Sequence, residues 1–172
     1  MMDVKTIKKD RLIYTKNKLS ANLAYVAILF DALYFVSIYS SDVDTYYYTM
    51  TIGISILYNL VFLLTAFLSS EGVKNYKGHY SWVIMIAGIL QFVRILGIPR
   101  MAHNTVLNLD GVDTIVMDGK QFAWVCICLI ASGIACIISG LISAYKVTTL
   151  NNYLKEKVFP LVVPRTKWIV SE

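Results

Sequence analysis

The sequence predicts an all-α integral membrane protein: a four-helix transmembrane bundle whose amino and carboxyl ends both lie in the cytoplasm. Of its 172 residues, 57% are hydrophobic and only 16% are charged, whereas about a quarter of a soluble domain is charged. The apolar residues are gathered into four runs of about 20, the length of helix that crosses a hydrocarbon core about 30 Å thick. Basic residues collect before the first run, between the second and third, and after the fourth, as the positive-inside rule requires of cytoplasmic segments.

Each apolar run is expected to form one membrane-spanning helix. The runs cover residues 19–39, 49–68, 80–98 and 122–145. Aromatic residues such as Trp82 and Trp124 lie near their ends, where the headgroup region favours rings that are apolar on one side and polar on the other. A soluble bundle of the same length would need amphipathic helices and far more charge, so that class is rejected.

The runs divide the chain into three parts. Residues 1–18 form a basic cytoplasmic segment, residues 19–145 form the four-helix transmembrane domain, and residues 146–172 form a cytoplasmic helix extension with an apolar docking tail. The net charge of +5 is concentrated beside the membrane, which indicates contact with lipid headgroups and no nucleic-acid binding. The small size and the lack of organelle targeting signals predict a multi-pass protein of a bacterial plasma membrane.

Two of the connections carry turn signals. Gly72 is expected to end the second helix, within a cytoplasmic connection of residues 69–79. The connection of residues 99–121 is the longest, and Asp110-Gly111 separates two runs of strand-forming residues within it. This pattern predicts a small extracytoplasmic loop or hairpin between the third and fourth helices.

Four polar residues interrupt the apolar runs near the expected centre of the bilayer. They are Asp31, Asn59, Gln91 and Arg94. At 1.5 Å per residue, each lies about 14–21 Å from the cytoplasmic end of its helix. A charge at that depth costs about 2.5–3.5 kcal/mol unless it is paired or hydrated. We therefore expect Asp31 to pair with Arg94, and Gln91 and Asn59 to satisfy the remaining donors and acceptors.

This polar layer has three interpretations. In the first, it is a structural clamp that fixes how the first three helices pack, since polar residues commonly hold membrane helices together. In the second, Asp31 binds a proton, a cation or a polar substrate, since ionisable groups within a membrane often mark transport pathways. In the third, Arg94 extends toward the membrane surface and Asp31 meets a partner subunit.

Small residues recur at steps of four along the fourth run, which places them on one face of its helix. One row consists of Cys128, Ser132, Cys136, Gly140 and Ala144, and a second row beside it consists of Ala131, Ala135, Ser139 and Ser143. Such a face lets another helix approach closely. It predicts either packing against the other helices of this chain or docking of a partner subunit or a second copy.

The carboxyl-terminal part is expected to extend the fourth helix and then to leave it. Val147, Leu150 and Leu154 fall on one helical face. Pro160 and Pro164 are expected to stop the helix and to leave an extended apolar segment from residue 158 onward. Because soluble tails rarely expose such a segment, we expect it to dock on the membrane or, preferably, in a groove of another subunit. The expected docking residues are Phe159, Leu161 and Trp168.

The sequence carries no catalytic signature. It has no glycine-rich phosphate loop, HExxH motif or nucleophile elbow, and His103 with the nearby aspartates lacks the spacing of a calcium-binding loop. No cofactor or metal is expected, and the chain is not expected to be an enzyme. The expected function is that of a non-catalytic accessory or assembly subunit of a larger membrane complex, such as a transporter, with lipids and other integral membrane subunits as partners. The alternative is a small homo-oligomeric transporter or channel that uses Asp31 as an ion- or proton-linked residue.

Overall fold

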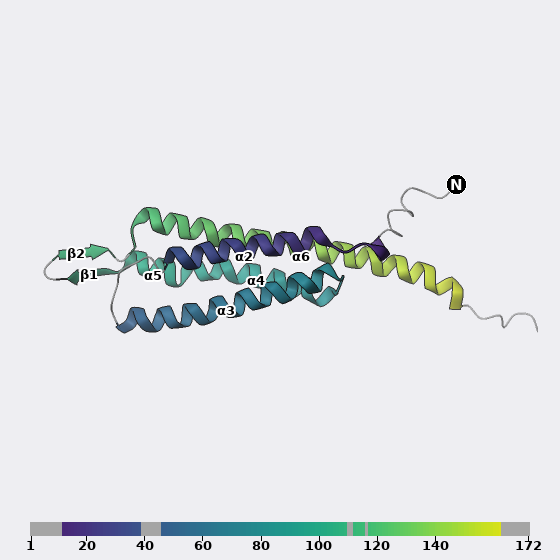
Figure 1. Ribbon diagram of the computed structural model, residues 1–172, viewed down its shortest axis with the longest axis horizontal. Coiled ribbons are helices and arrows are strands. Elements are labelled where there is room, and N and C mark those ends of the chain that lie inside the picture. Colours follow the sequence, from purple (N-terminus) through teal and green to yellow (C-terminus); the bar gives the residue numbers. More distant parts are fainter. Residues whose placement is uncertain (1–11, 39–45, 110–111, 116, 163–172) are drawn as a thin grey trace, which may run out of the picture.

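The chain forms a bundle of four long helices that lie side by side along its longest axis (Figure 1). The computed structural model describes residues 12–38, 46–109, 112–115 and 117–162, and the side chains of residues 12–38, 53–106, 115 and 117–155. The long helices are α2 (Lys18–Ile38), α3 (Tyr46–Lys74), α4 (Gly78–Leu96) and α6 (Gly119–Val162). All four are long and apolar enough to cross a membrane. The prediction of a multi-pass membrane protein with four spanning helices is confirmed at this level.

The helices are arranged so that α6 and α3 each pack along both α2 and α4. α2 and α4 therefore face each other across the centre of the bundle. The end that carries Lys18, Lys74, Lys77 and Lys146 is called the lysine end below, and the opposite end is called the hairpin end. Figure 1 shows α3 meeting the other helices at the lysine end and diverging from them toward Tyr46 at the hairpin end.

The core between the helices is built largely from small residues. Toward the lysine end it contains five alanines with Phe62, Val73, Ile84 and others, and toward the hairpin end Tyr34, Met117 and Leu129 are fully buried. The outward faces expose large apolar side chains on all four helices. This distribution is the one expected when lipid replaces water around the bundle.

The second helix is longer than predicted, because α3 does not end at Gly72. The ring of Tyr80 lies directly against the Cα of Gly72, where any side chain would collide with it. The helix instead ends two residues later in a Schellman motif, in which the amide of Lys77 donates to the carbonyl of Gly72 (3.1 Å) and the amide of Tyr76 donates to that of Val73 (3.3 Å). Tyr76 takes the left-handed conformation that this motif requires, with φ of 57°.

The connection after α4 is more ordered than a simple loop. Gly97 separates α4 from a short helix, α5 (Ile98–Asn104), which has Pro99 in its first turn, a position that tolerates the missing amide hydrogen. Two strands follow, β1 (Val106–Leu109) and β2 (Val112–Ile115), paired antiparallel with Val106 opposite Ile115. The connection thus contains a β hairpin, while its turn at Asp110-Gly111 lies outside the described residues. The side of the membrane on which it lies stays a prediction.

The last helix is the longest and includes the predicted extension. α6 has 44 residues, which at 1.5 Å per residue corresponds to about 66 Å. The prediction that Pro160 ends the helix is wrong: α6 continues through it to Val162, the last residue that the structure describes. Pro160 lacks one backbone N–H and so removes only one hydrogen bond of the helix. Phe159 and Leu161 therefore belong to α6 and not to an extended segment.

Candidate functional site

An ion pair lies in the centre of the bundle between α2 and α4. Asp31 of α2 is fully buried, and its Oδ1 accepts hydrogen bonds from Nε2 of Gln91 (2.8 Å) and from Nη1 of Arg94 (3.1 Å). Gln91 and Arg94 are three residues apart on α4, so both reach Asp31 from the same face. Three of the four residues of the predicted polar layer are therefore in direct contact.

α3 contributes Ser55, a residue outside the predicted polar layer. Nη2 of Arg94 donates to Oγ of Ser55 at 3.3 Å. Asn59 lies one turn further along α3, toward the lysine end, and is buried. Its Oδ1 has no hydrogen-bond partner among the described residues. Ser55 and Asn59 share a helix face, so the polar face of α3 extends over at least one turn.

Two tyrosine rings enclose the guanidinium group of Arg94. Its Cζ lies 4.2 Å from the ring centre of Tyr34 and 4.7 Å from that of Tyr58, within the roughly 6 Å that defines a cation–π contact. Tyr34 follows Asp31 by three residues, and Tyr58 follows Ser55 by three. The three-residue spacing from Asp31 to Tyr34, and from Ser55 to Tyr58, places each ring on the helix face of the polar layer. The predicted layer contained only amide and charged residues and therefore missed both rings.

The charges of the pair are balanced by several nearby groups. Arg94 lies in the last turn of α4, where the carbonyl end of the helix dipole favours a cation. The rings of Tyr34 and Tyr58 and the carboxylate of Asp31 also stabilise the positive charge of Arg94. Even so, Asp31 Oδ2, Gln91 Oε1 and Arg94 Nε have no hydrogen-bond partner among the described residues. The cluster therefore keeps two acceptors and one donor that ordered water can satisfy.

A second set of polar contacts joins α6 to its two neighbours. Ser139 Oγ donates to the carbonyl of Ser20 (2.8 Å), and Ser132 Oγ donates to that of Ala27 (2.9 Å). On the other side of α6, the hydroxyl of Ser81 in α4 donates to that of Ser143 (2.7 Å). All of these hydroxyls are buried and all are satisfied, so they act as contacts between closely packed helices.

Glycines bring the backbones of α4 and α6 together. A Cβ atom built on Gly133 would lie 3.0 Å from the carbonyl oxygen of Gly88 and 2.8 Å from the ring of Phe92. One built on Gly140 would lie 2.8 Å from the carbonyl oxygen of Ser81. Neither position has room for a side chain.

The small-residue rows of the fourth run are used inside the chain. Cys128, Ser132, Cys136 and Gly140 are buried and Ala144 is half-buried. Of the two interpretations, packing against the chain's own helices is the one that the structure has, and the partner-docking interpretation of this face is wrong. Two rows are needed because α6 packs closely against two helices, α2 and α4, rather than one.

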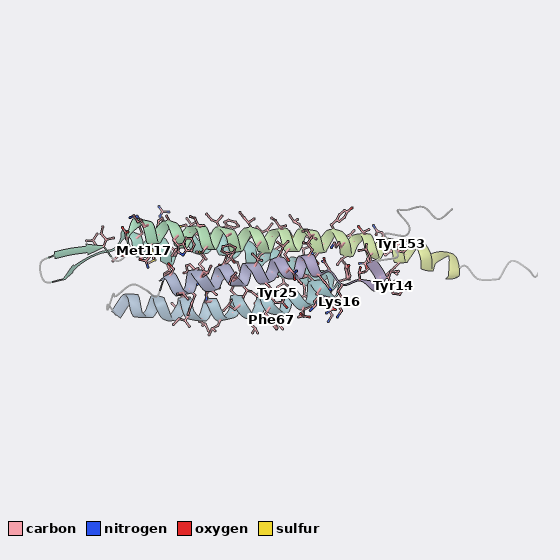
Figure 2. The ribbon with its side chains drawn as sticks, turned by 45° about the horizontal axis from the view of Figure 1, so that its top comes forward. Tyr14, Lys16, Tyr25, Phe67, Met117 and Tyr153 are labelled. Atoms are coloured by element: carbon pink, nitrogen blue, oxygen red, sulfur yellow. The ribbon has the colours of Figure 1, made fainter. Side chains whose placement is uncertain are left out.

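Asn17 joins three helices at the lysine end. Its backbone N–H donates to the carbonyl of Lys74 at the end of α3 (3.0 Å), and its side-chain Oδ1 accepts a hydrogen bond from Nζ of Lys146 in α6 (2.8 Å). Nearby, Tyr25 OH donates to Glu71 (3.1 Å), and the rings of Tyr25 and Phe67 (Figure 2) lie 6.4 Å apart. α3 is thus tied to α2 at this end. Sequence reasoning missed Asn17, because a polar residue just before a helix usually acts only as a cap.

The other predicted positions are less informative. The side chains of Phe159 and Leu161, and all of Trp168, lie outside the described residues. His103 is stacked on Phe122, with ring centres 4.6 Å apart, and its Nδ1 lies 3.2 Å from the carbonyl oxygen of Met117. Within the part of the chain that the structure describes, no three His, Cys, Asp or Glu residues are grouped as a metal site would require.

Comparisons of the chain with protein-family models, with curated proteins and with solved structures find no match.

Proposed function

We propose that this chain is a non-catalytic accessory or assembly subunit of a larger complex in a plasma membrane, such as a transporter, with both termini in the cytoplasm. In this proposal the bundle is a compact membrane anchor. The part of α6 beyond Tyr145 and the apolar tail that follows it bind the partner subunit. The positive charges at the lysine end support the cytoplasmic orientation.

The observation that carries this proposal is the length of α6. Figure 1 shows its carboxyl-terminal part extending beyond the ends of the other three long helices. Residues 146–162 account for about 26 Å of helix, whereas α4 has only 19 residues in total. A chain that needed only to cross the membrane would have no use for this extension, which carries exposed Leu154 and leads into the apolar residues after Val158.

The membrane-embedded part supports the same proposal by being complete in itself. The small-residue face of α6 is covered by α2 and α4, and Asp31 is paired within the chain. Neither feature requires a partner inside the membrane. Docking is therefore assigned to the extension and the tail, and no longer to the helix face that the sequence analysis also proposed.

The test is to purify the chain from its native membrane in mild detergent and to compare it with a version that ends at Lys157. We expect the full chain to carry a companion in fixed stoichiometry and the shortened chain to lose it, with unchanged thermal unfolding of the bundle. A matched control replaces Val36, exposed on the lipid face of α2, with Ala. Retention of every companion by the shortened chain would contradict the proposal.

A second candidate function is favoured by the polar atoms left without partners around Asp31. A small homo-oligomeric transporter or channel would use this carboxylate as its ion- or proton-linked residue. In this case the chain would purify alone as a defined oligomer, and Asp31→Asn would abolish ion flux in vesicles while the oligomer stayed intact. A companion in fixed stoichiometry and flux that is independent of Asp31 would exclude it.

A further inference from the structure

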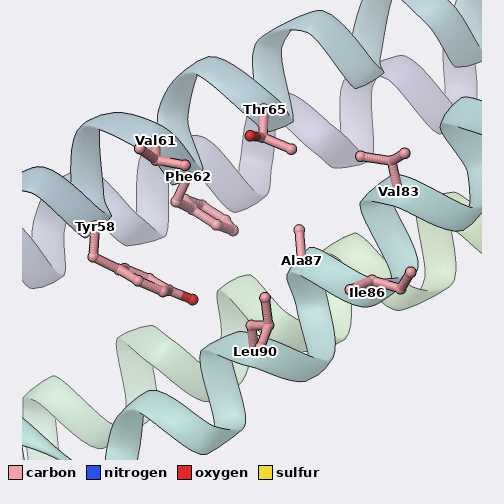
Figure 3. A pocket seen from close by; sticks show the side chains of 8 residues that line it. All are labelled: Tyr58, Val61, Phe62, Thr65, Val83, Ile86, Ala87 and Leu90. Carbon is pink, nitrogen blue, oxygen red and sulfur yellow. The ribbon is translucent and has the colours of Figure 1, made fainter.

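A groove with a volume of about 200 Å³ opens between α3 and α4 (Figure 3). Eight residues line it, four from each helix. Phe62 and Ala87 are each less than a tenth exposed and form its inner wall, while Val61 and Ile86 are more than half exposed at its rim. Apart from the hydroxyls of Tyr58 and Thr65, the lining is apolar. Because the rim belongs to the outer face of the bundle, the groove opens toward lipid.

The groove follows the direction of the helices and the depth of one leaflet. On α4 it extends from Val83 to Leu90. At 1.5 Å per residue, these positions lie about 9 Å and about 20 Å from Lys77 at the lysine end. Half of a hydrocarbon core is about 15 Å thick. The groove therefore extends from the middle of the leaflet nearest the lysines to the bilayer centre, where the terminal half of a lipid acyl chain runs.

Positive charge lies at the end of the membrane toward which the groove leads. The turn between α3 and α4 carries Lys74 and Lys77, and both precede the start of α4 at Gly78. Lys74 is held by Glu71, with 2.7 Å between Nζ and Oε1. Lys77 is exposed, so its charge is free to meet a headgroup. Two lysines against one carboxylate leave this turn positive, which complements an anionic headgroup.

From this apolar groove and the lysine turn above it, we propose that the α3–α4 groove binds one acyl chain of an anionic phospholipid whose phosphate contacts Lys77. The methyl end of the acyl chain then lies against the ring of Tyr58, which also lies 4.7 Å from the guanidinium Cζ of Arg94. The lipid fills the space that the diverging α3 leaves beside α4 and joins these two helices. This inference does not depend on the accessory-subunit proposal, because it concerns only the bundle and its bilayer.

The test uses the full chain in nanodiscs of phosphatidylcholine that contain a trace of photoreactive lipid. The probe carries a diazirine midway along one acyl chain and has either a phosphatidylglycerol or a phosphatidylcholine headgroup. After illumination, labelled residues are mapped by mass spectrometry. We expect labelling to concentrate on the facing sides of α3 and α4, at least threefold more strongly with phosphatidylglycerol than with phosphatidylcholine.

Two pairs of variants separate the headgroup from the chain. Lys77→Gln should reduce phosphatidylglycerol labelling to the phosphatidylcholine level, while Lys120→Gln at the hairpin end should leave it unchanged. Val61→Trp at the exposed rim should block the groove and lower its labelling several-fold, while Val36→Trp on the exposed face of α2 should not. All four sites are on the surface, so the bundle is expected to fold in each variant, which circular dichroism checks.

Several outcomes would overturn the proposal. Labelling spread evenly over the outward faces of all four helices would show that the groove is ordinary membrane surface. Equal labelling by the two headgroups would remove the role of Lys77. Efficient disulfide crosslinking of two copies through Val61→Cys would show that a second copy of the chain, and not a lipid, covers the groove.

Discussion

The two sides of α4 pack in opposite ways. Against α6, glycines bring the backbones together and every buried serine hydroxyl of the contact has a partner. Against α3, a groove lined by the aromatic side chains of Tyr58 and Phe62 remains between the helices. The difference indicates that α2, α4 and α6 form the closely packed part of the bundle. α3 is held at the lysine end and, near the membrane centre, by its contacts with Arg94.

The largest expected effect comes from breaking the ion pair between Asp31 of α2 and Arg94 of α4, the residue that also contacts α3. Arg94→Gln leaves the Asp31 carboxylate buried without a counter-charge, which should cost about 3–5 kcal/mol of unfolding free energy. Asp31→Asn should cost a similar amount, and the double variant should recover more than half of the sum, because it leaves no buried charge. Unfolding in mixed detergent, followed by circular dichroism, measures all three. Losses that simply add would show that the two residues do not act as a pair.

A smaller effect is expected from substituting the glycines of the tight side. Gly133→Leu places atoms where Phe92 and the carbonyl of Gly88 already lie, and overpacking of this kind costs about 1–3 kcal/mol. The matched control is Gly53→Leu on α3, where a Cβ would meet nothing within 4 Å. It should be neutral or slightly stabilising, because glycine is a poor helix former. Equal losses at both positions would contradict the distinction between a tight and a loose side.

The smallest effect is expected from single hydroxyl groups. Ser139→Ala removes the hydrogen bond that its hydroxyl donates to the carbonyl of Ser20 in α2, at a cost of about 0.6 kcal/mol and at most about 1.7 kcal/mol for such contacts in a membrane. Ser70→Ala on α3 should cost nothing or stabilise the bundle, since it removes a buried hydroxyl that has no partner among the described residues. The same unfolding measurement compares them, and a larger loss for Ser70→Ala than for Ser139→Ala would refute the comparison.

The features that could be predicted from the sequence are those set by a short repeat or a long apolar run. The four spans and the pairing of Asp31 with Arg94 follow from length, helical rise and the cost of an isolated charge in lipid. The ends of the helices were harder to predict from the sequence. A glycine can mark the end of a helix, but it also occurs inside a helix where an aromatic ring packs against it. Gly72 is of the second kind, and only the position of Tyr80 in the fold distinguishes the two.

The partners of the candidate site could be predicted only in part for a related reason. The sequence shows that Asn59 is polar and close to the right depth, but not how far α3 is rotated about its axis. That rotation brings Ser55 to Arg94 and leaves Asn59 beyond it. Likewise, two rows of small residues on the fourth run indicate close packing, but their sequence does not show how many helices of the same chain will cover them.

The continuity of α6 has a mechanical consequence. Within its described length, its only proline is Pro160, in the last turn, so the helix offers no place for a sharp bend between the hairpin end and its tip. It is held near Lys146, whose Nζ donates a hydrogen bond to Oδ1 of Asn17 at 2.8 Å. A tilt of about 10° at that point would carry Val162, about 24 Å away, through about 4 Å. A small change in how the helices of the bundle pack would thus be enlarged at the far end of α6.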